Sequence, residues 1–274
     1  MNKTILELQY ILKENNDKSD LYKRNLLKDY LQIMALKYLY SHPKYGELIF
    51  CGGSVLAHCH GLPRLSEDLD FVDTSKRIKN NELAEDLEKY FSEKLRLPVK
   101  IKNQKFRIYL KFPILKDLQL SGAGQTDLLF LKVEIFKEFN FCKKYKTETI
   151  PLFKYNQSIL IKTFDLPTLM STKIRAVLYH QWKKTNKEGK HFIGVKGRDY
   201  FDLMWYLQKG IQPNFGCLEI KDKEKLKSEL LKIVSKIDTK SVILDLENFI
   251  ADRKFVNNLG PNIKTILQNS IGKM

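Results

Sequence analysis

Two aspartates, Asp68 and Asp70, stand one residue apart in the stretch "SEDLDF" of an otherwise basic chain. The alternation of acidic and apolar residues predicts a β-strand, whose two-residue period places both carboxylates on one face. Carboxylates held this close repel each other and raise a pKa unless a cation lies between them. Mg²⁺ prefers carboxylate oxygens and substrate phosphates, and a pair of such ions suits in-line displacement at phosphorus. The two aspartates therefore predict a divalent-metal site.

A glycine pair and a serine, Gly52, Gly53 and Ser54, precede the aspartates. "ELIFCGG" predicts a short buried strand that stops at glycine, and "SVLAHCHG" predicts a helical turn or two closed by Gly61. Glycines let a backbone approach a phosphate closely, and the free N–H groups at the start of a helix favour an anion. This segment therefore predicts the triphosphate end of the same site.

The charge of the whole chain favours a polyanionic partner. The 274 residues contain 48 Lys+Arg against 32 Asp+Glu, which gives a formal net charge of +16. Nucleic acid is the leading candidate, and a general bias of composition towards lysine is the alternative explanation. No apolar run of about 18 residues exists to span a bilayer, and the first residues lack the features of a signal peptide. We therefore expect a cytoplasmic protein without membrane contact.

Four cysteines are scattered singly, without a C-x-x-C pair, and this predicts reduced, mostly buried thiols. Cys51, His58, Cys59 and His60 form a cluster of zinc-ligand types. In a helix, however, the side chains at 58, 59 and 60 point in three directions, so that one ion cannot easily collect them. A zinc site is therefore not favoured, and the cluster is left without a role.

Apolar periodicity predicts an α/β N-terminal lobe, residues 1–162, and an all-helical C-terminal lobe, residues 163–274. In the first lobe the expected elements are helices at 21–42 and 77–97, two strands within 99–115 around Asn103-Gln104, and strands at 126–136 and 158–164. A strong helix with an Asp165 cap opens the second lobe, and three or four more helices follow a basic, glycine-containing loop at 183–197.

Several motifs of the chain resemble known nucleotidyltransferases. Gly53-Ser54, thirteen residues and then Asp68-x-Asp70 resemble the signature G-S-x(9-13)-D-x-D of the DNA polymerase beta-like nucleotidyltransferase superfamily. "GGSVLAHCHGLPRLSEDLDF" is more closely similar to the GG[TS]-x-L…R-x-S-x-D-[IL]-D-F block of the AbiEii/AbiGii-type toxin nucleotidyltransferases, the group that includes the MenT toxins. "LKVEIF", "LPTLMSTKIRAVLYH" and "KGRDYFDLMWYL" resemble three further blocks of that family, in the same order.

The resemblance implies a polymerase-beta-like mixed sheet and a role for each matching residue. It implies Asp68, Asp70 and Glu134 as ligands of two Mg²⁺ ions, with Mn²⁺ as an alternative. It also implies that Lys173 and the turn from Gly52 to Ser54 hold the triphosphate of an NTP. The remaining matches are Arg64 and Ser66, which either hold their loop or touch phosphate, Asp199 as a catalytic residue, Arg198 beside it, and Asp202, for which a first-turn helix acid is the competing interpretation.

The function that the resemblance implies is that of a toxin with an antitoxin partner. It would move NMP from an NTP to the 3′ end of tRNA, release pyrophosphate and block translation. Segments 180–198 and 221–236 are the expected RNA contacts, with Trp182, His191 and Phe192 as candidates for stacking on an unpaired end.

Three alternatives stay open. A small-molecule acceptor is one, although a cationic acceptor would be repelled by the charge of +16. A protein hydroxyl, including the antitoxin's own, is the second, and a non-catalytic RNA-binding module on a decayed enzyme fold is the third. The sequence does not choose the nucleotide, the tRNA, the antitoxin type or the oligomeric state.

Overall fold

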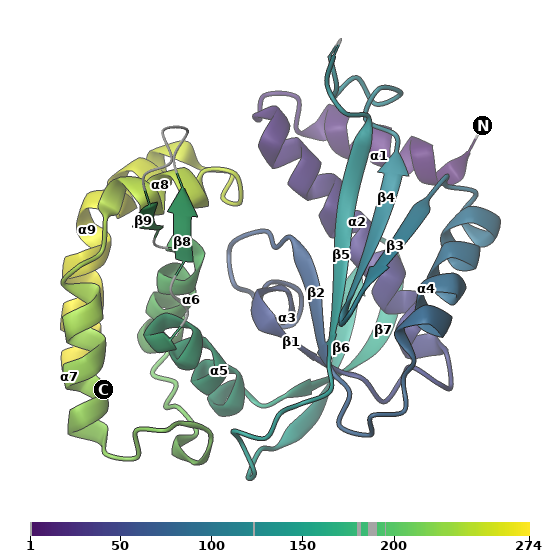
Figure 1. Ribbon diagram of the computed structural model, residues 1–274. Helices are drawn as coiled ribbons and strands as arrows, with labels where there is room; N and C mark the ends of the chain where they lie inside the picture. Colours follow the sequence, from purple (N-terminus) through teal and green to yellow (C-terminus); the bar gives the residue numbers. More distant parts are fainter. Residues whose placement is uncertain (1, 123, 180–181, 186–190, 195) are drawn as a thin grey trace. The chain divides into compact units, whose positions relative to one another are not determined.

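The chain divides into two compact units, each described by itself below (Figure 1). The computed structural model describes residues 2–122, 124–179 and 196–274, and the backbone alone of 182–185 and 191–194. Unit 1 comprises Met1–Phe139 and Thr147–Thr163, and unit 2 comprises Asn140–Lys146 and Phe164–Met274. The chain therefore passes from one unit to the other after residues 139, 146 and 163.

Unit 1 is built on a seven-stranded mixed sheet of order β3-β4-β5-β2-β1-β7-β6. The central pair β2 and β5 is parallel, whereas β1 pairs antiparallel with β2, and β4 antiparallel with both β3 and β5. The strands are β1 (Ile49–Cys51), β2 (Asp68–Val72), β3 (Lys100–Gln104), β4 (Arg107–Pro113), β5 (Leu128–Phe136), β6 (Thr147–Lys154) and β7 (Gln157–Phe164). The mixed α/β class expected from the sequence is thus confirmed.

The alternation predicted for the acidic strand is present in β2. Leu69 and Phe71 are fully buried, while Asp68 and Asp70 between them are partly exposed. Burying a large apolar side chain of this kind contributes roughly 1.5–3 kcal/mol, so the apolar face fixes the register. The carboxylates are therefore held on the opposite face.

Helices of unit 1 pack against the sheet, α2 on β5 and α4 on β3 and β4. The helices are α1 (Lys3–Glu14), α2 (Asp20–Ser41), α3 (Gly52–Cys59) and α4 (Asn80–Lys89), the last continued by a π-helical turn, η1 (Tyr90–Lys94). The expected helix at 77–97 is thus shorter, and its buried residues Leu83, Leu87 and Phe91 face the core. Strand β6 was not anticipated, because its burial pattern is mostly exposed and carries little apolar periodicity.

Unit 2 is mainly helical. Its helices are α5 (Leu166–Tyr179), α6 (Gly197–Gln208), the short 3₁₀ turn η2 (Phe215–Cys217), α7 (Lys223–Val234), α8 (Thr239–Leu246) and α9 (Arg253–Gly272). The expectation of an all-helical lobe with a loop at 183–197 is wrong in one respect. The backbone of β8 (Trp182–Thr185) and β9 (His191–Gly194) forms an antiparallel pair, with Trp182 opposite Gly194.

The cysteines correct a second expectation. Cys142 and Cys217 form a disulfide across 75 positions of sequence, whereas Cys51 and Cys59 are free. The expectation of four reduced thiols is therefore wrong for one pair. The bond ties segment Asn140–Lys146 to the rest of unit 2.

Within the described residues, no helix is both long enough and apolar enough to cross a membrane.

Candidate functional site

The turn from β1 into α3 brings the glycine pair against the acidic strand. Cys51 lies opposite Asp70 in the antiparallel register, and α3 begins at the next residue. Gly52 has a φ of +77°, a left-handed conformation that disfavours any side chain. A Cβ at this position would also collide with the carboxylate of Asp70. Only glycine therefore lets the helix begin directly beside the acid.

The next glycine faces a cation. A Cβ on Gly53 would collide with the guanidinium of Arg64 and lie 3.5 Å from Oγ of Ser66. Both side chains are buried, and Nη1 of Arg64 donates to the carbonyl of Leu65 at 2.8 Å. The sequence-predicted residues Gly53, Arg64 and Ser66 thus come together at the start of α3. A helix N-terminus and a guanidinium at one place favour an anion.

Ser54, in the first turn of α3, is completely buried. Its Oγ has no hydrogen-bond partner within the described structure. A buried hydroxyl without a partner costs free energy, about 1–3 kcal/mol, so its retention calls for an explanation outside folding. A hydroxyl in the first turn of this helix matches the predicted triphosphate end.

The predicted acids lie on neighbouring strands, and two cations hold Asp68 and Glu134. Asp70 stands opposite Glu134 in the parallel register, and Asp68 stands opposite Lys132. Nζ of Lys132 lies 2.8 Å from Oδ2 of Asp68 and 3.0 Å from Oε1 of Glu134. Nε of Arg107, on β4, donates to the same Oε1 at 2.6 Å.

Burial and ion pairing act in opposite directions on this cluster. Burial raises the pKa of the Asp68 carboxyl, and the nearby Lys132 ammonium opposes that shift without cancelling it. For Lys132, partial burial disfavours the charged form, yet the ion pairs with Asp68 and Glu134 outweigh it and raise the pKa of the ammonium. Lys132 is therefore charged at neutral pH and neutralises part of the acidic cluster.

The donor set suits a hard divalent cation, because two carboxylate oxygens already converge on one positive charge. That charge is the Lys132 ammonium. Across the part of the chain that the structure describes, no group of three or more His, Cys, Asp or Glu side chains is arranged to hold a metal ion. The metal role of Asp68, Asp70 and Glu134 thus stays a prediction, and it requires Lys132 to yield its place.

A second charged cluster lies inside unit 2. Nζ of Lys173, on α5, lies 2.7 Å from Oδ1 of Asp199 and 2.8 Å from Oδ2 of Asp202, both on α6. The side chains are 12%, 10% and 0% exposed, respectively. The structure therefore brings these three sequence-predicted residues together as a buried ion-pair triad. Their roles in binding or catalysis remain predictions.

Arg198, the predicted residue next to Asp199 on α6, is held by α8. Its backbone N–H donates to Oδ2 of Asp245 at 2.9 Å, and its guanidinium lies over the ring of Phe249, 4.1 Å from the centroid. These contacts stabilise the start of α6. The side chains of Trp182, His191 and Phe192, the predicted stacking residues, lie outside the described part of the chain.

The cysteine and histidine cluster serves the core of unit 1. Nε2 of His58 lies 2.9 Å from Oε1 of Gln32, whose amide nitrogen donates to the Ser66 carbonyl. Burial lowers the pKa of His58 to about 4, so the ring is neutral at pH 7. Burial also raises the pKa of the Cys51 and Cys59 thiols. His58 thus orients the loop before the acidic strand through Gln32.

Sequence reasoning missed Lys132 and Arg107 as members of the site. A signal for Lys132 was available, because the two-residue period that selects Glu134 on the strand also selects Lys132. Arg107 gave no such signal. Its position opposite Glu134 depends on the register of β4 with β5, which the sequence does not fix.

One family of known proteins and two solved structures are similar to this chain. The model of the family described as nucleotidyl transferase AbiEii toxin, type IV TA system, matches residues 35–269. Two solved structures from Helicobacter pylori are similar at 18% identity. One is JHP933, with a TM-score of 0.47 and coverage of 91% of this chain and 94% of that one. The other is described as a candidate nucleotidyltransferase, with a TM-score of 0.48 and coverage of 90% and 96%.

No curated protein gave a significant match to the chain. The family model spans most of the sequence, including the glycine turn, both acidic strands and the Lys173 triad. The chain therefore belongs to the nucleotidyl transferase AbiEii toxin family of type IV toxin–antitoxin systems.

Proposed function

We propose that this nucleotidyltransferase moves a nucleoside monophosphate from an NTP to the 3′ end of a tRNA and thereby blocks translation. The observation that carries the proposal is the contact of Gly52 with Asp70, because it places the anion-favouring start of α3 beside the carboxylates. The net charge of +16 supports an RNA acceptor. Membership of the family implies an NTP substrate and an antitoxin partner.

In the proposed reaction the acceptor hydroxyl attacks the α-phosphorus of the NTP. A new P–O bond forms, the bond from the α-phosphorus to the bridging oxygen breaks, and pyrophosphate leaves. Glu134 favours loss of the proton from the attacking hydroxyl, and that proton passes to solvent water. Mg²⁺, or Mn²⁺ in its place, held by Asp68, Asp70 and Glu134, would supply positive charge to the reacting oxygens. Positioning and charge neutralisation would provide most of the rate.

The chain's own groups would bind the nucleotide through its phosphates. The first turn of α3 offers backbone N–H groups and the buried hydroxyl of Ser54, and Arg64 lies beside Gly53. The family resemblance adds Lys173 as a phosphate ligand. Since its ammonium is held by Asp199 and Asp202, such a contact would exchange one carboxylate for a phosphate oxygen.

The test is transfer of radiolabel. Purified protein is incubated with total tRNA, Mg²⁺ and each α-³²P-labelled NTP separately, beside an Asp68→Asn/Asp70→Asn variant. Asp117→Asn is a matched control, because Asp117 is an exposed acid away from the sheet. The proposal expects label in tRNA with one NTP, lost in the double variant and kept in the control.

Other outcomes separate the alternatives. Label in protein would contradict a tRNA acceptor and support nucleotidylation of a protein. Label in a small molecule would contradict a tRNA acceptor and support a small-molecule acceptor. NTP binding without label in any acceptor would favour a non-catalytic module and would contradict the proposed chemistry.

A further inference from the structure

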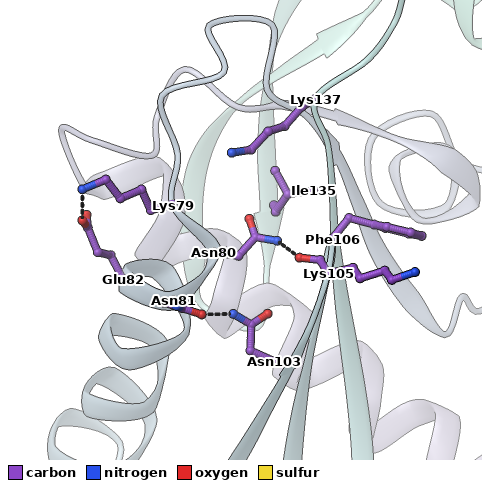
Figure 2. A pocket seen from close by; sticks show the side chains of 9 residues that line it. All are labelled: Lys79, Asn80, Asn81, Glu82, Asn103, Lys105, Phe106, Ile135 and Lys137. Carbon is purple, nitrogen blue, oxygen red and sulfur yellow. Dashed lines mark hydrogen bonds and ion pairs between the residues drawn. The ribbon is translucent and has the colours of Figure 1, made fainter.

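A pocket of unit 1 lies where the β3–β4 hairpin meets the start of α4 and the end of β5 (Figure 2). Its volume is about 900 Å³, which is enough for a ligand as large as a nucleotide. None of the site residues predicted from the sequence lines it. We call it the hairpin pocket; the residues used below are Lys79, Asn80, Asn103, Lys105, Phe106 and Lys137.

The hairpin pocket is positively charged. Lys79, Lys105 and Lys137 reach it from three separate segments, and Glu82 is the one acid in its lining. Glu82 is already bound by Lys44 and by Lys79, the latter at 3.0 Å (Figure 2). Lys105 and Lys137 make no ion pair with any residue that the structure describes. Two uncompensated ammonium groups on one cavity favour an anionic ligand such as a phosphate.

The hairpin turn itself breaks the usual rules of turn composition. Gln104 pairs with Arg107, so the turn consists of Lys105 and Phe106 alone, two positions later than the turn expected at Asn103-Gln104. Lys105 has a φ of +49°, where glycine or asparagine is favoured. Local rules are broken most often where residues serve a function, and here both turn residues belong to the lining of the pocket.

An exposed ring and two amides accompany the lysines. Phe106 is 36% exposed, although exposing a large apolar side chain to water does not stabilise the folded protein. Aromatic rings of this kind stack on unpaired bases. The side-chain oxygens of Asn80 and Asn103 accept no hydrogen bond within the described structure. Amides recognise the edges of bases whose Watson–Crick groups are free.

We propose that the hairpin pocket binds a segment of single-stranded RNA, with one phosphate at Lys105, another phosphate at Lys137 and a base on Phe106. The inference deepens the proposed function, on which it rests for the identity of the acceptor. An acidic peptide would pair with the lysines equally well, but the exposed ring and the asparagine amides favour a base.

A short series of contacts joins the pocket to the catalytic carboxylates within unit 1. The guanidinium of Arg107 lies over the ring of Phe106, 4.7 Å from its centroid. The same side chain donates to Oε1 of Glu134 at 2.6 Å. Phe106, which lines the hairpin pocket, therefore contacts the arginine that donates to a predicted catalytic acid.

The test measures RNA binding without NTP or metal. The probe is a fluorescein-labelled single-stranded RNA of about ten nucleotides, followed by anisotropy over a range of salt. Lys105→Ala/Lys137→Ala should weaken binding about tenfold and reduce the salt slope by about 1.4, because two phosphate contacts are lost. Lys13→Ala/Lys116→Ala removes the same charge from exposed positions of unit 1 and should change affinity less than twofold.

The ring is tested separately. Phe106→Leu should weaken RNA binding fivefold or more, which is about the contribution of one stacked base. Phe106→Tyr keeps an aromatic ring and should bind RNA as tightly as the wild-type protein. Equal losses from the pocket pair and the control pair would overturn the proposal, since charge would then act without a site. So would a Phe106→Leu variant that binds normally. Binding of an acidic peptide in place of RNA would assign the pocket to a protein partner and overturn it as well.

These results are independent of the transfer assay. Weaker RNA binding in the pocket variants, with no nucleotide transfer by the wild-type protein, would support the pocket and contradict the proposed function. Transfer to tRNA by the wild-type protein, with an unchanged KM for tRNA in the pocket variants, would support the proposed function and contradict RNA binding in the hairpin pocket.

Discussion

The ammonium of Lys132 lies 2.8 Å from the carboxylate of Asp68, across the parallel register of β2 and β5. It also reaches Glu134, so one lysine forms ion pairs with two of the acids predicted to hold metal. A cation is thus built into the acidic face of the sheet. Its presence has consequences for stability and for metal affinity that differ in sign.

Replacing Lys132 by methionine should destabilise the metal-free protein and strengthen metal binding. The partly exposed Asp68 loses the Lys132 ammonium, and the buried Glu134 keeps Arg107, so the free energy of unfolding should fall by about 1–2 kcal/mol, less than for a fully buried pair. Mn²⁺ affinity should rise about fivefold, because about 1 kcal/mol of repulsion is removed. Urea melts and Mn²⁺ titration measure both quantities. Lys111→Met, on β4 over Phe130, is the control, and equal effects in both variants would contradict the assignment.

Gly52→Ala should abolish activity, whereas Gly61→Ala should not. Both glycines have positive φ, +77° and +73°, so both substitutions strain the backbone by roughly 1–2 kcal/mol. A Cβ at Gly61 would meet nothing within 4 Å, but a Cβ at Gly52 would displace the Asp70 carboxylate. We expect a loss of at least about 100-fold in kcat for Gly52→Ala alone, measured by transfer of label. Similar rates of transfer for the two variants would show that the Asp70 carboxylate takes no part in the reaction.

Lys173→Met should destabilise unit 2 by about 3 kcal/mol, because it removes the Lys173 ammonium from two buried carboxylates, Asp199 and Asp202. Adding Asp202→Asn should recover part of that stability. If Lys173 binds phosphate, the double variant will melt at a higher temperature than the single variant and remain inactive. If the double variant recovers activity together with stability, Lys173 contributes to folding and not to phosphate binding.

Acid should destabilise the protein through His58. Its folded pKa of about 4 lies below the unfolded value of 6.5, so the unfolded state binds more protons between these values. This stability is complete above pH 6.5 and is lost as the pH falls towards 4, about 2 kcal/mol of it by pH 5. Urea denaturation at pH 7, 6 and 5 measures the slope. His58→Asn should flatten it, and an unchanged slope would exclude His58 as the source.

Lys105→Asn should raise stability and lower RNA affinity at once. Asparagine tolerates the left-handed conformation that costs lysine free energy, so the melting temperature should rise by a few degrees. The same change removes one ammonium from the hairpin pocket and should weaken RNA binding severalfold. Thermal melts measure the change in stability, and fluorescence anisotropy measures the change in RNA affinity. A gain in both quantities would mean that the lysine has no use in the turn.

The sequence predicted those parts of the site that depend on neighbours along the chain. The alternation around Asp68 and Asp70 and the glycines before α3 needed only a period and a turn. The partners of those residues depend on register. Lys132 and Arg107 meet Glu134 only because β4, β5 and β2 pair as they do. The Cys142–Cys217 bond gave no sequence signal either, because single cysteines at wide spacing do not indicate a pairing.

The three passages of the chain between the units limit how the protein can be dissected. A fragment that begins at residue 164 would contain all the helices α5 to α9 but would lack Asn140–Lys146, and with it Cys142. Cys217 would then carry an unpaired thiol in a place shaped for a disulfide. A single proteolytic cut cannot release unit 2 intact, so degradation of this toxin from its N-terminus as far as residue 163 would leave a C-terminal remnant that lacks one segment of its own unit.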